Sequence, residues 1–230
     1  MSSTRLPGKV LRPLAGAPML LRQIERLRRC RRIDRLVVAT SLDRSDDVLA
    51  EVLATNGVPA HRGELEDVLG RYLGALDIHG PADHVVRLTG DCPLADPDLI
   101  DRVIDHHLRS GADYTSNTWG RRSFPKGLDA EVMKASVLAQ AAAEASAPYD
   151  REHVTPFIYA RPDRYRLEGV TQQADEGDVR WTVDLPEDYE FAAAVFETLY
   201  PDAPAFTSAD VRAFVRTRPE LAKLGGERRV

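Results

Sequence analysis

The chain has 230 residues, of which 43% are hydrophobic and 29% are charged, and its formal net charge is -5. This length suits one domain with a sizeable core, and the acidic balance argues against a nucleic-acid binder with a basic surface. No apolar run has the length of a membrane span and no signal peptide is recognisable, so we expect a cytoplasmic protein without a membrane partner. Cys30 and Cys92 lack metal-ligand spacing and should be reduced thiols.

The first segment, 2–9, is a basic turn that reads Ser-Ser-Thr-Arg-Leu-Pro-Gly-Lys. Hydroxyl groups, two cations and a glycine can surround a polyanion with side-chain donors and backbone N–H groups. The residues that we expect to contact the polyanion are Ser2, Ser3, Thr4, Arg5, Gly8 and Lys9. The segment is not a P-loop, because Val10 follows the lysine where that motif needs Ser or Thr. A solvated chain end is the alternative interpretation.

Short apolar strands then alternate with helices up to residue 116. The spacing of apolar residues and the capping signals predict helices over 19–31, 45–56, 66–79 and 97–110. Strands are expected over 36–39, 58–61, 84–88 and 112–116. This alternation predicts an α/β fold whose mostly parallel sheet is covered by helices on both faces, with ligands bound beyond the carboxyl ends of the strands.

The pattern changes from Trp119 onward. Strands over 128–133 and 165–170 and helices over 136–145 and 150–159 suggest a small subdomain or dimer arm spanning about 119–170. A strand at 180–183 returns the chain to the sheet, and helices follow over 186–200 and from 208 onward. One domain is therefore expected over 1–224, with a disordered tail at 225–230.

Two aspartates are expected at the tips of two strands. Asp91 comes shortly after the strand 84–88, and Asp184 directly after 180–183. One or two carboxylates, with substrate phosphates and water, are what Mg²⁺ requires, so this pair opposite the basic turn predicts a magnesium site. The alternative is that each aspartate only caps the element that follows it.

Three further segments form a recognisable pattern together with the basic turn. They are Leu-Thr-Gly-Asp-Cys-Pro-Leu at 88–94, Arg-Glu-His-Val-Thr-Pro at 151–156 and Val-Asp-Leu-Pro-Glu-Asp at 183–188. Together the four resemble the sugar-acid cytidylyltransferases, most closely the spore-coat polysaccharide branch. That branch is related to the enzymes that make the CMP forms of 3-deoxy-octulosonate and neuraminate. The similarity runs from Ser2 to about Tyr200, and it implies a Rossmann-like nucleotidyltransferase fold, a homodimer, CTP and Mg²⁺.

The resemblance also implies roles for individual residues. Arg5 and Lys9 would hold the triphosphate, and Asp91 and Asp184 the metal. The other implied nucleotide-binding residues are Thr89, Gly90 and Arg71. A sugar hydroxyl would attack the α-phosphorus with loss of pyrophosphate, a reaction that depends on positioning and charge neutralisation rather than on a protein nucleophile.

The implied acceptor is an acidic sugar, bound within the segment 119–170. The candidate acceptor residues are Lys126, Asp129, Glu131, Arg151 and His153. A solvated loop and a capped helix are an equally good interpretation of these residues.

The family's basic turn follows a buried central strand, whereas this sequence starts at the turn itself. The first central strand is therefore expected to be missing, which would leave buried backbone groups of its neighbours unpaired. We expect the 230-residue chain to be unstable or inactive and about ten upstream residues to rescue it.

Three other functions remain open at this point. The donor could be GTP or UTP, or the chain could be a catalytically inactive dimerisation partner. A glycosyltransferase with an Asp-x-Asp metal motif is the third, because Asp96-Pro97-Asp98 has the right letters, although it opens a helix.

Overall fold

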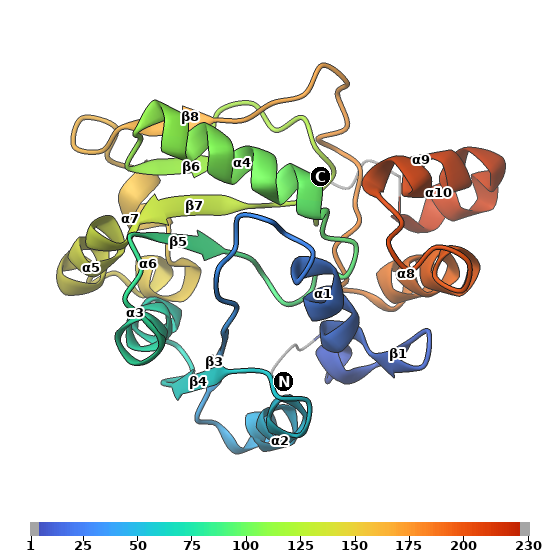
Figure 1. Ribbon diagram of the computed structural model, residues 1–230, viewed down its shortest axis with the longest axis horizontal. Coiled ribbons are helices and arrows are strands. Elements are labelled where there is room, and N and C mark those ends of the chain that lie inside the picture. The colour runs from blue at the N-terminus through green and yellow to red at the C-terminus, as the bar shows by residue number, and fades with distance from the viewer. Residues whose placement is uncertain (1–4, 226–230) are drawn as a thin grey trace.

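The structure is a computed structural model that describes residues 5–225 (Figure 1). The expected ligand residues Ser2, Ser3 and Thr4, and nearly all of the tail 225–230, lie outside this range. Within 5–225, none of the helices combines the length and the apolar character needed to cross a bilayer.

The described strands are β1 (Pro13–Leu14), β2 (Ala17–Pro18), β3 (Val38–Ser41), β4 (Ala60–Gly63), β5 (His84–Arg87), β6 (Tyr114–Ser116), β7 (Glu131–Lys134) and β8 (Leu167–Gly169). The α-helices are α1 (Met19–Leu27), α2 (Asp47–Thr55), α3 (Val68–His79), α4 (Pro97–Ser110), α5 (Ala135–Glu144), α6 (Pro148–His153), α7 (Pro156–Tyr159), α8 (Pro186–Leu199), α9 (Ser208–Thr217) and α10 (Pro219–Gly225). Two 3₁₀ turns, η1 (Lys9–Leu11) and η2 (Arg44–Asp46), complete the order.

The main sheet has four strands in the order β5-β7-β6-β8, and β3 and β4 form a separate parallel pair. The expectation of a mostly parallel sheet needs correction, because β7 runs antiparallel to both β5 and β6. The chain returns from β6 to β7 without a crossover helix, and only parallel neighbours require such a crossover. As a result Glu131, the first residue of β7, lies opposite Arg87 and Ser116 at the carboxyl ends of β5 and β6.

Several local elements differ from the sequence prediction. The segment 180–183 makes only an isolated bridge, between Arg180 and Lys126, rather than a strand. The predicted helix over 150–159 is broken into α6 and α7 at Val154, whose φ is +73°. The β1–β2 hairpin and α10 were not predicted; the hairpin turns at Ala15 and Gly16, both with positive φ.

The two faces of the main sheet are covered by different helices, as expected for an α/β fold (Figure 1). On β7, Val132 packs into the core formed with α1, α4 and α8, whereas the next residue, Met133, packs into the core formed with α3, α5 and α7. Val86 and Val85 of β5 divide in the same way. This alternation follows from the two-residue repeat of a strand, and it fixes the sheet between two helical layers.

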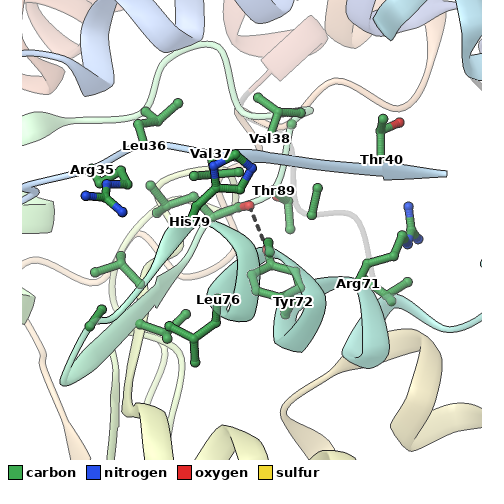
Figure 2. A pocket seen from close by; sticks show the side chains of 18 of the residues that line it. Arg35, Leu36, Val37, Val38, Thr40, Arg71, Tyr72, Leu76, His79 and Thr89 are labelled. Carbon is green, nitrogen blue, oxygen red and sulfur yellow. Dashed lines mark hydrogen bonds between the residues drawn. The ribbon is translucent and has the colours of Figure 1, made fainter. Parts of the chain in front are cut away.

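A wide space separates the two sheets. Among residues 5–225 no backbone hydrogen bond joins β3 to β5, and between them lies a cavity of about 1610 Å³ (Figure 2). Its walls are mostly apolar and include Leu36 just before β3, Val38 of β3, Leu76 of α3 and Val86 of β5. We call this cavity the inter-sheet slot.

Candidate active site

Asp91 and Asp184 meet at the carboxyl end of β5. The backbone N–H of Val183 donates to the carbonyl of Asp91 over 2.8 Å, which holds the two segments side by side. The segment after Asp184 is fixed by Asp188, whose carboxylate accepts the backbone N–H groups of Asp184 and Leu185 over 2.9 Å each at the start of α8. The sequence therefore located both aspartates at one rim, although 180–183 is not a strand.

Lys9 joins the two aspartates. Its ammonium group donates to Asp91 Oδ2, to Asp184 Oδ1 and to the carbonyl oxygen of Val183, and all three distances are 2.8 Å. The side chain of Lys9 is only 12% exposed. Burial lowers the pKa of Lys9, but Asp91 and Asp184 outweigh it and leave that pKa raised, so the group stays charged. We call Lys9, Asp91 and Asp184 the strand-tip cluster.

The basic turn places this lysine through a glycine. Gly8 has φ +68°, in the left-handed region, and directly precedes the 3₁₀ turn η1 that starts at Lys9. Arg5 of the same turn forms an ion pair with Asp184 Oδ2 at 3.3 Å, and its side chain is 60% exposed. The turn therefore brings two cations to the same rim, one buried and one accessible.

Arg180 is a further member of the site that the sequence reasoning missed. It donates to Asp184 Oδ2 over 2.5 Å and to both carboxylate oxygens of Asp188. Burial of Asp184 raises its pKa, but bonds from Lys9 and Arg180 outweigh this, and the net effect is a lowered pKa. Asp184 and Asp188 follow Arg180 at intervals of four residues. This spacing in the sequence could have indicated that Arg180 pairs with them.

The donor set of the strand-tip cluster fits a divalent cation. Asp91 Oδ2 and Asp184 Oδ1 lie no farther apart than twice 2.8 Å, because each contacts the same nitrogen, and a backbone carbonyl faces the same point. The part of the chain that the structure describes has no group of three or more His, Cys, Asp or Glu side chains arranged for a metal. An ion here would complete its shell with water and substrate oxygens, as Mg²⁺ does.

Cys92 does not supply a nucleophile. Its thiol is buried, 3.5 Å from Asp91 Oδ1 and 3.2 Å from the hydroxyl of Thr89. Burial, with Asp91 next to it, raises the pKa of this thiol strongly, so it remains protonated. Cys30 is likewise buried and unbonded to another cysteine.

Three of the predicted nucleotide residues line the inter-sheet slot. Thr89, Gly90 and Arg71 all line this cavity, and Thr89 and Arg71 are visible together in Figure 2. The Nε of Arg71 is buried and has no hydrogen-bond partner among the described residues, while its Nη2 donates to the carbonyl of Leu65. An unpartnered buried donor beside a cavity is suited to a ligand acceptor.

The predicted acceptor residues divide into two groups. Asp129, Glu131 and His153 line a cavity of about 210 Å³, which we call the small pocket; Thr89 also lines it, so it adjoins the nucleotide residues. Lys126 and Arg151 do not line it. The other lining residues, missed by sequence reasoning, are Arg87, Thr118, Tyr149, Thr155 and Tyr159.

Most charges around the small pocket are paired within the protein. Glu131 accepts from Arg87, Tyr114 and Thr155. Asp129 forms a two-pronged pair with Arg122, at 2.6 and 3.0 Å.

Arg151 is also paired within the protein. It forms a two-pronged pair with Asp67, at 2.8 and 2.6 Å, and donates to the carbonyl of Ala142. Arg151 thus ties α6 to the start of α3. Lys126 is exposed, and its backbone pairs with Arg180.

The Asp96-Pro97-Asp98 segment is a helix cap. Asp96 Oδ1 accepts the backbone N–H groups of Asp98 and Leu99, at 3.0 and 3.2 Å, and its Oδ2 accepts that of Ser208. Both oxygens of this buried carboxylate accept hydrogen bonds from backbone N–H groups, as in a helix N-cap. This role argues against the Asp-x-Asp metal motif of a glycosyltransferase.

The fold and the rim of convergent charges define the class: this is an α/β nucleotidyltransferase fold. A solved CMP:2-keto-3-deoxy-manno-octonic acid synthetase in complex with CTP shares it, with a TM-score of 0.64 over 85% of this chain and 94% of that one, at 17% identity.

The family follows from closer similarities, and the chain belongs to the cytidylyltransferase family, whose model matches residues 1–211. A cytidylyltransferase from Leptospira borgpetersenii has a TM-score of 0.90 and 30% identity, covering 100% of this chain and 95% of that one. The spore coat polysaccharide biosynthesis protein SpsF of Bacillus subtilis is 33% identical over 229 residues, 96% of this chain and 93% of the relative.

Proposed function

We propose that this protein is a Mg²⁺-dependent cytidylyltransferase that transfers CMP from CTP to a hydroxyl of an acidic sugar, for polysaccharide or glycan synthesis. The observation that carries the proposal is the strand-tip cluster, in which one lysine and two aspartates from distant parts of the chain meet at the rim. Family membership and the similarity to SpsF support the donor and the pathway class. Free, buried cysteines fit a cytoplasmic protein.

The chemistry requires one bond to form and one to break at the α-phosphorus. The sugar hydroxyl oxygen bonds to that phosphorus and loses its proton, while the bond to the oxygen of the leaving pyrophosphate breaks. Asp91 and Asp184 would hold Mg²⁺, which supplies charge neutralisation at the α-phosphate and the incoming oxygen when bound. Arg5 and Lys9 neutralise the leaving pyrophosphate, and Arg180 keeps the Asp184 carboxylate in place.

The nucleotide-binding residues adjoin the acceptor pocket in this proposal, because Thr89 lines both the inter-sheet slot and the small pocket. Thr89, Gly90 and Arg71 bind the nucleotide, and Ser2, Ser3, Thr4 and Gly8 belong to the same set. The small pocket receives the sugar, with His153 and the Arg87 guanidinium facing it. Lys126, Asp129, Glu131 and Arg151 are also predicted to contact the sugar. Asp129 and Glu131 line the small pocket and are held in internal pairs, so we assign them to shaping it. Arg151 does not line the pocket, and we assign it to holding α6 against the start of α3.

A pyrophosphate-release assay tests the function. With Mg²⁺ and a panel of acidic sugars, CTP should support release with at least one sugar, and EDTA should abolish it. Thermal-shift titration with CTP, GTP, UTP and ATP, each with Mg²⁺, identifies the donor independently of the acceptor. A larger stabilisation by GTP or UTP than by CTP would contradict the assignment to CTP.

We also propose a finer description of the fold. The domain spans 1–224, its segment 119–170 contributes to acceptor binding and to a homodimer, and the inter-sheet slot is the place of one further apolar central strand, parallel to β3 and β5. The walls of the slot and the lack of hydrogen bonds between these strands support this.

A further inference from the structure

The ammonium group of Lys9 has no hydrogen left for a phosphate in this structure. A lysine ammonium carries three N–H donors and no acceptor. All three have partners at 2.8 Å, namely Asp91 Oδ2, Asp184 Oδ1 and the Val183 carbonyl. Lys9 can therefore contact a triphosphate only if it releases at least one of these oxygens.

The oxygens that Lys9 contacts are the ones that a divalent ion would need. Asp184 Oδ2 is already held by Arg180 and Arg5, so Oδ1 is the oxygen that faces Asp91. An ammonium group and a divalent cation cannot share these two oxygens, because two positive charges within a few ångströms repel each other strongly. Occupation by one excludes the other.

The surrounding groups allow Lys9 to leave without disturbing the aspartates. Arg180 is held by both oxygens of Asp188, and its side chain is only 10% exposed, so it keeps Asp184 oriented. Asp91 is tied through its own backbone carbonyl to Val183. The lysine side chain is flexible, and a change of rotamer moves the ammonium group without moving the backbone.

We infer that the point between Asp91 Oδ2 and Asp184 Oδ1 is a single cation site that the Lys9 ammonium and a divalent ion occupy in turn, with the nucleotide triphosphate driving the exchange. This inference rests on the proposed function. The phosphates offer Lys9 new acceptors, and its departure exposes both carboxylates to the metal. The protein without nucleotide is therefore a weak binder of divalent ions, and nucleotide and metal bind with positive coupling.

Direct Mn²⁺ binding, followed by the EPR signal of free Mn²⁺, tests the exchange without turnover. The variants are Lys9→Met and Lys9→Gln, each checked by thermal melting. Lys134→Met is the matched control, because it removes a lysine that pairs with Asp113 at the same 2.8 Å, outside the site. Without nucleotide, the Lys9 variants should bind Mn²⁺ at least tenfold more tightly than the wild type, and the control should not.

Two further measurements complete the test. CTP should lower the Mn²⁺ dissociation constant of the wild type at least tenfold, and that of the Lys9 variants much less. Adding Asp91→Asn to Lys9→Met should abolish the gain in affinity. Unchanged Mn²⁺ affinity in both Lys9 variants, a gain that survives Asp91→Asn, or a wild type without coupling to CTP would each overturn the inference.

Failure of the proposed function gives a different pattern of results. If no sugar supports pyrophosphate release, but Lys9→Met still gains Mn²⁺ affinity through Asp91, the cation exchange stands and the transfer reaction does not. If release occurs with CTP and the Lys9 variants gain nothing, the enzyme stands and the exchange falls.

Discussion

The strand-tip cluster and the small pocket next to it contain similar charged groups in different arrangements. In the cluster, a single ammonium group bridges two carboxylates from separate segments, and the Asp91 side chain is still 26% exposed. At the small pocket, Glu131 is 7% exposed and accepts three hydrogen bonds from the scaffold, while Arg87 is its fixed partner. Charges that can exchange partners are suited to chemistry, and charges with fixed partners maintain shape.

The largest expected effect is on catalysis at the cluster. Lys9→Ala removes the cation that neutralises the pyrophosphate, so turnover should fall by about 10²- to 10³-fold while the fold is retained. Pyrophosphate release and a thermal melt measure the two properties separately. Lys134→Ala, which breaks a lysine–aspartate pair elsewhere, should leave turnover within threefold of the wild type; a Lys9→Ala enzyme equally active would remove Lys9 from the mechanism.

The second effect is on stability at the small pocket. Glu131→Gln leaves the Arg87 guanidinium without its buried counter-charge, and breaking such a pair costs about 3–5 kcal/mol. Urea denaturation should show this loss in the free energy of unfolding. Glu144→Gln is the matched control, because its pair with Arg164 is exposed and should contribute little. Equal effects of the two substitutions would mean that Glu131 does not support the scaffold.

The sequence was sufficient to predict part of the strand-tip cluster but not all of it. The sequence placed Asp91 and Asp184 at one rim, and in the structure the segments that carry them lie side by side, because the Val183 N–H donates to the Asp91 carbonyl. The bridge from Lys9 to these aspartates was not foreseen, because it spans 82 and 175 positions and leaves no local pattern. Pairing of this kind is decided by packing and can be recognised only in three dimensions.

The direction of β7 was missed for a related reason. Helix and strand patterns identify elements, but the antiparallel entry of β7 between β5 and β6 depends on how the segment 117–130 folds back. The ion pairs of Glu131 with Arg87 and of Asp129 with Arg122 were missed for the same reason. The contact of Glu131 and Asp129 with a sugar, expected from their alternation, stays a prediction.

The smallest expected effect is a loss of folding stability at acid pH, which we assign to the buried His107 and not to the strand-tip cluster. His107 of α4 is fully buried between His84 and the hydroxyl of Thr115, and burial, followed by the charges of His84 and Lys134, lowers its pKa to about 4. The unfolded chain takes up this proton near pH 6.5, so stability is full above that pH and falls progressively towards pH 4, by up to about 3 kcal/mol.

The cluster should contribute nothing to this loss. The pKa of Asp184 is lowered, so its contribution to stability is present above the ordinary pKa of aspartate and disappears only below it. Urea denaturation at pH 7.5 and pH 5 should therefore show a smaller pH dependence in His107→Gln than in the wild type. A wild-type dependence that persists in the variant would assign the acid sensitivity to other groups.

The central claim is that Asp91 and Asp184 hold the metal of the transfer reaction and that Lys9 serves the phosphates. The most direct measurement is an anomalous difference map from crystals grown with Mn²⁺ and CTP. A peak in coordination contact with Asp91 Oδ2 and Asp184 Oδ1, with the Lys9 ammonium on a phosphate oxygen, is the predicted result. A bound nucleotide with Mn²⁺ away from these oxygens, and Lys9 still joined to both carboxylates, would contradict it.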